Sequence, residues 1–337
     1  MGERELLNTR PWILDPEEEV TLRKYLDALM TGLRLPSGTD TQGITADRVP
    51  HKVFEVLTHR DFCYLSKSRV SRYQEGVLGV ANRALTRGEP IHFYYDLGGG
   101  YHASTQPGEE DVSFQVGLAE LFVLSQISDF SARVKRFYPA GVKFSLVIDN
   151  MCALLINDIS LEKTLGYCTR LRALIQELDL SNVVDVLVES EHISVADFER
   201  ARGATMERDW SIALTRKQHD NVERFLGRPC DDAEAFGRTV RYLEVIDVSE
   251  RLLEPLIHGV HMTQRATDTT ICFRPFPGGD SRIQCGEVVL TRNSKQKLYP
   301  VLLTSSNRGQ YACRRHRFPA LLSSLIPHVT YAELSSG

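Results

Sequence analysis

The stretch RFYPAGVKFSLVIDN, residues 136–150, decides the fold of this 337-residue chain. A Pro-Ala-Gly turn closes the helix that precedes it, and residues 142–148 then form a nearly continuous apolar run of strand length. Apolar side chains on both faces of a strand are typical of a parallel sheet that helices cover on both sides. The stretch therefore predicts a buried strand of an α/β fold, with Asp149 and Asn150 at its carboxyl end.

Helical and strand patterns alternate on both sides of this central strand. In chain order, the sequence predicts a helix over 68–86, a short strand at the start of PIHFYYDLGGGYHAS (residues 90–104), a helix over 111–137, a helix over 161–178 that Ser160 caps, and a buried strand over 183–188. Alternation of this kind favours a Rossmann-like parallel sheet with right-handed crossovers and flanking helices.

The remaining segments divide the chain into four parts. An N-terminal helix starting at Asp15 and Pro16, with a loop, occupies 1–50; the Rossmann-like core occupies 51–193; a charged helical segment occupies 194–254; and a β-rich part that packs on the core occupies 255–337. In that last part, the short runs TTICFRPF, GEVVLTR and LYPVLLTS, separated by turns, predict an antiparallel sheet.

Composition limits the kinds of partner. A formal net charge of −4 disfavours nucleic-acid binding, which draws on clustered Lys and Arg. The sequence has no apolar run of the roughly 18 to 20 residues that cross a bilayer, and its N-terminus is charged, so we expect no membrane partner and a cytoplasmic location. The seven cysteines are scattered without a CxxC pair, which indicates reduced, mostly buried thiols and predicts no metal site.

The first candidate site is DLGGGYHAS, residues 96–104. Glycines at the end of a strand let the backbone approach a ligand and present amides to an anion, and open α/β sheets bind ligands at this edge. We assign Tyr101 and His102 as catalytic candidates, and Gly99, Gly100 and Ser104 as substrate-binding candidates. The segment lacks the nucleotide fingerprint GxGxxG, and a flexible turn is the alternative.

The second candidate is the carboxyl end of the central strand. Asp149 is a catalytic candidate, because a carboxylate there can orient an amine or move a proton, and Asn150 is a substrate-binding candidate. Asp158, shortly after, has the alternative of a routine helix cap.

The third candidate is a set of cationic and polar residues in the C-terminal part. Arg265, Arg274 and Gln284 are substrate-binding candidates, since guanidinium groups bind carboxylate or phosphate bidentately, although a surface salt bridge is the commoner role of an arginine. His258 and His261 would point to opposite faces of a strand, which argues against a shared metal ion. The basic run at 314–317 is either a solvated face or a phosphate clamp.

Three segments, in order, make the chain resemble the isonitrile synthases of pyoverdine and dityrosine biosynthesis. They are GEPIHFYYDLGGG (88–100), RFYPAGVKFSLVIDN (136–150) and TLGYCTRLRALIQEL (164–178), with a weaker match at HMTQR (261–265). Of the family's Ser-Asp-Gly motif only Asp149 is kept, and the lysine of its first active-site loop has no counterpart among residues 98–104.

The resemblance implies an α/β enzyme, a lyase or transferase of natural-product or siderophore biosynthesis. Such an enzyme condenses the α-amine of an amino acid with a pentulose phosphate such as ribulose 5-phosphate, without a cofactor, and leaves an isonitrile. Asp149 would then act as acid or base with help from His102, and Arg265 and Arg274 would hold the carboxylate and the phosphate. The missing lysine leaves two alternatives open. One is other chemistry on an amino-acid amine, such as metal-dependent N-oxygenation or N–N bond formation, and the other is a non-catalytic anion-binding module. The amino acid and the oligomeric state are left open.

Overall fold

The core of the computed structural model is a sheet of five parallel strands. The structure describes residues 44–63, 71–97, 116–157, 159–205, 215–226, 229–263, 271–272, 288–292, 298–302, 311–317 and 328–334, with scattered helical positions between 16 and 28. The strands are β1 (Ile91–Asp96), β2 (Val142–Ile148), β3 (Val184–Val188), β4 (Val260–Thr263) and β5 (Ile271–Cys272), in the spatial order β3-β2-β1-β4-β5. Strand β2, which lies between β3 and β1, confirms the prediction made from residues 142–148.

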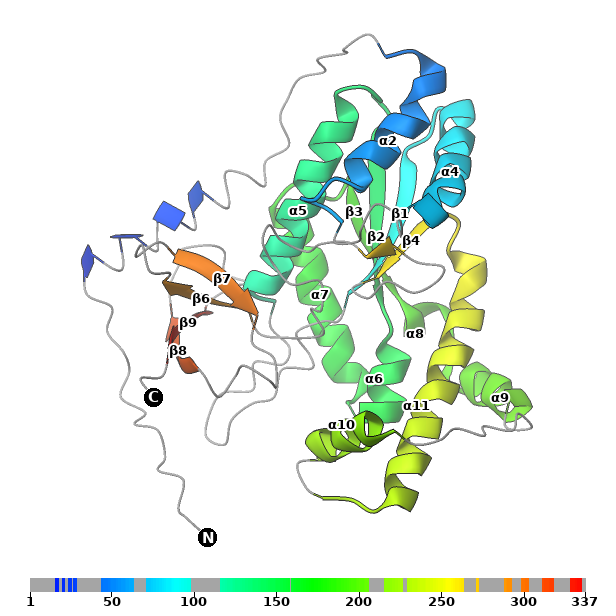
Figure 1. Ribbon diagram of the computed structural model, residues 1–337, viewed down its shortest axis with the longest axis vertical. Helices are drawn as coiled ribbons and strands as arrows, with labels where there is room; N and C mark the ends of the chain where they lie inside the picture. The colour runs from blue at the N-terminus through cyan, green and yellow to red at the C-terminus, as the bar shows by residue number, and fades with distance from the viewer. Residues whose placement is uncertain are drawn as a thin grey trace.

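Helices cover both faces of this sheet (Figure 1). One face packs against α2 (Val49–Leu57), α4 (Gln74–Arg87), α5 (Leu118–Lys135) and α7 (Leu161–Glu177), and the other against α6 (Asn150–Asn157), α9 (Val195–Thr205) and α11 (Asp232–Leu253). The short helix α8 (Glu189–His192) directly follows β3, and the 3-10 turns η1 (Ala46–Arg48), η2 (Ser71–Tyr73) and η4 (Glu254–Leu256) join these elements.

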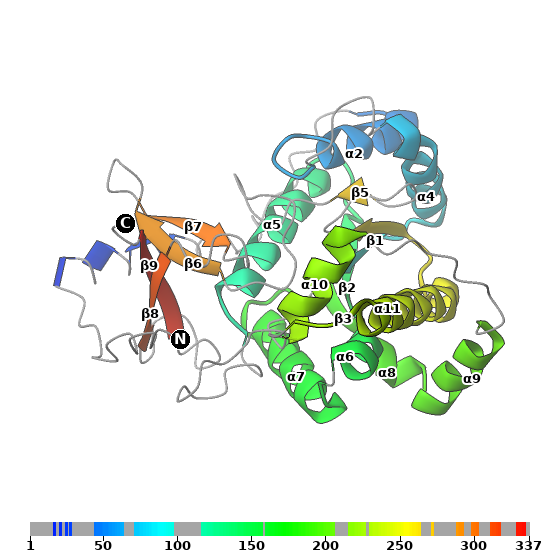
Figure 2. The ribbon, with the colours of Figure 1, turned by 60° about the horizontal axis from the view of Figure 1, so that its bottom comes forward.

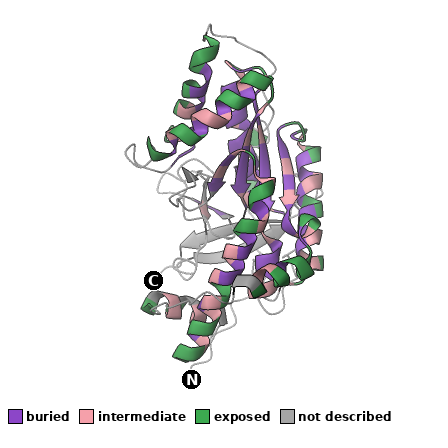
Figure 3. Cartoon of the chain, turned by 90° about the vertical axis from the view of Figure 1, so that its right-hand side faces the viewer, coloured by how far each residue is buried: buried purple, intermediate pink, exposed green. Residues whose placement is uncertain are grey.

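Alternating side chains of each strand supply the two cores. Phe93 and Phe144 stack at 5.1 Å between ring centroids on the first face, with Phe130 of α5 edge-on to both, whereas Tyr94 and Val147 point to the second face. Figure 3 shows the core strands buried and the outer sides of the helices exposed. Burial on both faces explains why residues 142–148 are nearly all apolar.

Local signals end and begin the helices where the sequence predicts. Gly88 ends α4 in the left-handed conformation, with φ of 66°, which glycine adopts without steric cost. Ser160 caps α7, because its hydroxyl accepts a hydrogen bond from the Lys163 amide. These caps fix the crossovers that carry the chain from one strand to the next.

The helical segment after β3 consists of α9, α10 (Arg216–Leu226) and α11. Figure 2, which brings the lower end of Figure 1 forward, shows α10 and α11 in front of the sheet, at the end where the carboxyl ends of the strands lie. No helix among the described residues is both long enough and apolar enough to span a membrane.

A second sheet closes the chain beside α5 (Figure 1). It contains β6 (Val288–Arg292), β7 (Leu298–Leu302), β8 (Tyr311–Arg317) and β9 (His328–Leu334), in the order β7-β6-β9-β8, and Leu290 of β6 belongs to the main core. The α/β fold with a helical segment and a C-terminal sheet is thus confirmed.

Two details of the predicted antiparallel sheet were wrong. β5, from TTICFRPF, pairs in parallel with β4 in the core sheet, and β6 pairs in parallel with β9, while the β6–β7 and β8–β9 pairs are antiparallel. Side chains alternate between the two faces of a strand in parallel and in antiparallel sheets alike. The sequence of a two-residue strand therefore does not show whether it pairs in parallel or antiparallel.

Candidate active site at the carboxyl end of the parallel sheet

The strand order places a switch point between β1 and β4. From β1 the chain crosses through α5 to β2 on one side, whereas β4 is followed by β5 on the other side. In open α/β sheets, connections that diverge from neighbouring strands leave a crevice at their carboxyl ends, and ligands bind there. The side chains at the ends of β1 and β4 are therefore candidate catalytic or ligand-binding residues.

A histidine and a carboxylate meet at this switch point. β1 and β4 pair with Tyr94 opposite His261, so His261 and Asp96, two residues beyond Tyr94, lie on the same face of the sheet. His261 Nε2 is 2.9 Å from Asp96 Oδ1, and both side chains are partly buried. Burial of the imidazole opposes its protonation, but the hydrogen bond to Asp96 and the negative charges of Asp96 and Glu250 outweigh burial and raise the pKa of His261. The pair therefore favours an imidazolium beside a carboxylate.

Glu250 of α11 is the third titratable group at this point. Burial raises its pKa, the charge of His261 lowers it, and the charges of Asp96 and Asp247 raise it, with a net increase. Two groups with displaced pKa values, His261 and Glu250, beside a carboxylate at a switch point are typical of sites that transfer protons.

Another carboxyl group lies at the end of β3, on the far side of β2 from the switch point. Glu189 is completely buried; its Oε1 accepts a hydrogen bond of 2.6 Å from Ser249 Oγ, and its Oε2 accepts one of 3.1 Å from the Met151 amide. Burial raises the pKa of Glu189 despite these two donors. Because Ser249 and Glu250 are consecutive on α11, this helix contacts both groups of side chains at the carboxyl edge.

Cys152 lies beside these carboxylates but is poorly suited to act as a nucleophile. It is buried in α6, and burial, followed by the charges of Asp149 and Glu189, raises the pKa of its thiol well above the usual value. The thiolate is the reactive form of cysteine, so Cys152 stays protonated and inert at neutral pH.

Asp149 occupies the place that the sequence predicts for it, directly after β2. Its carbonyl oxygen accepts hydrogen bonds from the Cys152 and Ala153 amides and so begins α6. Its side chain is partly buried, and its charge contributes to the raised pKa of Cys152. The catalytic role of Asp149 stays a prediction.

Asn150 is placed differently from a substrate-binding residue. It is completely buried; its Nδ2 donates to Thr164 Oγ1 at 3.2 Å and to Ser190 Oγ at 2.7 Å, and its Oδ1 accepts from the Ser190 amide at 3.0 Å. Both amide hydrogens are used within the fold. Asn150 therefore ties α6 to α7 and to the end of β3, and its position is that of a structural residue.

The other predicted site residues lie outside the described part of the chain: Gly99, Gly100, Tyr101, His102, Ser104, Asp158, Arg265, Arg274 and Gln284. The basic run at 314–317 lies on β8.

Sequence reasoning missed Glu189 and Glu250. It gave no role to Asp96, although this residue begins the candidate segment 96–104, and it considered His261 as a metal ligand and as part of the weak match HMTQR. Asp96 and Glu189 were detectable, because each is an acidic residue at the end of a buried strand, the criterion that selected Asp149. Glu250 was not, because only the packing of α11 on the sheet brings it to His261.

No family model matches the sequence, and a search of curated proteins finds no match. Among solved structures, the fold is similar to that of the PvcA protein from Pseudomonas aeruginosa, with a TM-score of 0.57 and 16% sequence identity. The similarity covers 78% of this chain and 94% of the PvcA chain, so it includes nearly the whole of that structure.

Proposed function

We propose that the chain is an enzyme of specialised metabolism that acts on the α-amine of an amino acid, with chemistry like that of the isonitrile synthases. The sequence resemblance over residues 88–100, 136–150 and 164–178 supports this proposal, and the similarity in fold to PvcA points the same way. The function itself depends on the site, because one fold serves many reactions.

The observation that carries the proposal is the Asp96–His261 pair at the switch point. When an amine condenses with a ketone, the ammonium group loses a proton to a base, and the hydroxyl of the intermediate leaves as water after it gains a proton from an acid. An imidazolium held by a carboxylate serves as the acid, and the imidazole that it becomes serves as the base. The negative charge of Glu250 helps to raise the pKa of His261.

The remaining roles follow from the sequence. The described residues at the ends of β1 and β4 reach the switch point, and in the sequence the glycine segment and Arg265 come shortly after them. We assign the backbone amides of Gly99 and Gly100, with Ser104 and Gln284, to substrate binding, and Arg265 and Arg274 to the carboxylate and phosphate groups. Tyr101, His102 and Asp149 are proposed to assist proton transfer.

The test is to offer the purified protein each common amino acid, with and without ribulose 5-phosphate, and to follow loss of the primary amine by mass spectrometry. We expect one amino acid to be consumed, and only when the pentulose phosphate is present. His261→Gln and Asp96→Asn should each lower turnover by about 100-fold or more, whereas His258→Gln, three residues away, should not.

Two outcomes contradict the proposal. If no amino acid is consumed although one binds saturably, the chain is a ligand-binding module. If His261→Gln consumes the amine as fast as the wild-type protein, the reaction does not use the Asp96–His261 pair. Circular dichroism of each variant separates loss of chemistry from loss of fold.

A further inference from the structure

A cluster of metal-binding side chains lies on α10 and the start of α11, away from the candidate active site. His219 and Glu223 are four residues apart on α10 and therefore share one face of the helix. Cys230 comes just before α11. The donor atoms of His219, Glu223 and Cys230 all lie within 4.8 Å of one another. Two helices and the segment between them thus converge on one point.

The three side chains are the ligand types that zinc prefers. Imidazole nitrogen, carboxylate oxygen and thiolate sulfur bind Zn²⁺, and a neutral imidazole with a carboxylate and a thiolate balances its two positive charges. Zinc bond lengths put neighbouring ligand atoms of a tetrahedral site roughly 3.3 to 3.8 Å apart. His219 Nδ1 and Glu223 Oε1 are already 3.7 Å apart, and the Cys230 amide donates a hydrogen bond of 3.3 Å to the same carboxylate oxygen, so the three residues are held close together.

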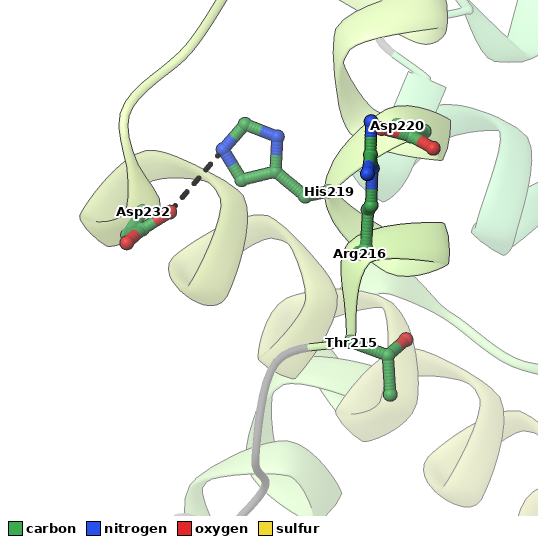
Figure 4. Close-up of a pocket in the computed structure, with 5 residues that line it drawn as sticks. All are labelled: Thr215, Arg216, His219, Asp220 and Asp232. Carbon is green, nitrogen blue, oxygen red and sulfur yellow. Dashed lines mark ion pairs between the residues drawn. The ribbon is translucent and has the colours of Figure 1, made fainter.

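A second carboxylate lies on the other nitrogen of the same imidazole. His219 Nε2 is 3.4 Å from Asp232 Oδ1 (Figure 4). A histidine that binds a metal commonly donates its other ring N–H to a carboxylate, which fixes the tautomer and makes the ligating nitrogen more basic. With Nδ1 toward Glu223 and Nε2 toward Asp232, His219 is prepared to bind a cation through Nδ1.

The site is open to solvent on the Asp232 side. A pocket of about 320 Å³ is lined by Thr215, Arg216, His219, Asp220 and Asp232. Figure 4 shows His219 reaching toward Asp232, while Asp220 lies on another side of α10. With three protein ligands, one position of a tetrahedral zinc ion is left for water.

The cluster is separate from the candidate active site. Along α11, Asp232 and Glu250 are 18 residues apart, which corresponds to about 27 Å of helix. We propose that His219, Glu223 and Cys230 bind a zinc ion, with Asp232 orienting the histidine, and that this ion clips α10 to the start of α11. The ion stabilises the helical segment and takes no part in the reaction.

The test uses full-length protein purified without a metal-affinity tag and stripped with a chelator. Zinc binding is measured by competition with a chromophoric chelator, and cobalt is used as a spectroscopic substitute. We expect one zinc ion per chain, a thiolate-to-cobalt charge-transfer band in the near ultraviolet, and a rise in the midpoint of thermal unfolding when zinc is added. Cobalt bound without a thiolate band would exclude Cys230 as a ligand and overturn the proposal.

Variants separate this site from the other cysteines and histidines. Cys230→Ser should remove the charge-transfer band, His219→Ala and Glu223→Gln should each weaken zinc binding by at least tenfold, and Asp232→Asn should weaken it by ~10-fold to 100-fold. Asp220→Asn, on the same helix, is the matched control and should bind as the wild-type protein does. Because His219 and Asp232 lie at the surface of the helical segment, their variants keep the test valid if Cys230→Ser fails to fold. Zinc binding that is absent, or equal in the wild-type protein, His219→Ala and Glu223→Gln, would overturn the proposal.

Discussion

Replacing Gly259 by alanine tests whether close contact between β1 and β4 holds the candidate active site together. Gly259 directly precedes β4, and a Cβ at this position would lie 2.8 Å from the carbonyl carbon of His92, closer still to the His92 oxygen, and 2.9 Å from Cε2 of Tyr94. Ordinary contacts of a Cβ begin at 3.4 Å. Because the nearest atoms are backbone, β4 must move away from β1 by more than about half an ångström.

This displacement has two measurable consequences. Strain of this kind in a packed core costs about 1 to 3 kcal/mol of stability. His261 follows two residues later and is carried with the strand, so its 2.9 Å hydrogen bond to Asp96 lengthens past the useful range. Since misplacement of a catalytic group by about 1 Å costs roughly 100-fold in rate, amine consumption should fall by up to that factor.

Urea denaturation and the amine-consumption assay measure the two effects on the same protein. Gly237→Ala in α11 is the matched control: a Cβ there meets no atom within 4 Å, and replacing a glycine inside a helix stabilises by about 0.5 to 1 kcal/mol. If Gly259→Ala unfolds at the same urea concentration as the wild-type protein and keeps its activity, the argument from β1–β4 contact is refuted.

Three further predictions follow from the pKa shifts. Burial raises the pKa of Glu189 above its usual 4.5, so the folded state binds the proton more tightly than the unfolded chain; this contribution to stability is present below pH 4.5 and lost as pH rises through the folded-state pKa. In Glu189→Gln the side-chain amide does not titrate, and it donates a hydrogen bond to Ser249 where the carboxylate accepts one. As pH rises from 4.5 through the folded-state pKa of Glu189, the stability of the variant in urea titrations should therefore increase relative to that of the wild-type protein. A stability difference that does not change with pH would contradict this. Cys152 should resist iodoacetamide in the native state and react after denaturation, as peptide mass spectrometry shows; rapid native labelling would contradict its raised pKa. In NMR titrations, the pKa of His261 should lie above 6.5 and fall in Asp96→Asn; an unchanged value would show that Asp96 does not stabilise the imidazolium.

The core of the fold was predictable because its signals are local. The apolar run at 142–148 is a strand buried on both faces, and the caps at Gly88 and Ser160 depend on a few neighbouring residues. The direction of β5 and the partner of β9 were not predictable, because long connections and tertiary packing set them. Local patterns therefore identified the elements, while some of their pairings required the structure.

Only part of the candidate site could be predicted, because some of its contacts also depend on tertiary packing. Asp149 was selected as a candidate because it follows a buried strand, and the same rule would have selected Asp96 at the end of β1. The Asp96–His261 contact joins residues 165 positions apart in the sequence, and its register comes from β1 and β4 lying side by side. For Asn150 the sequence pattern is the same whether a polar residue after a strand faces a ligand or forms hydrogen bonds with buried partners such as Ser190, and the structure shows the buried partners.

The metal-binding cluster also depends on tertiary structure. Cysteine spacing alone predicts no metal site, because Cys230 has no cysteine near it in the sequence. His219 and Glu223 share a helical face, but only the packing of α10 on α11 brings the cysteine to them.

The pH dependence of amine consumption in the wild-type protein and Asp96→Asn tests most directly whether the pair at the switch point transfers the proton. With an imidazolium as the acid, the rate should fall as pH rises through the raised pKa of His261, and loss of the carboxylate should move that fall to lower pH. If both proteins show the same profile, the proton comes from another group, and the assignment of this pair as the catalytic acid is wrong.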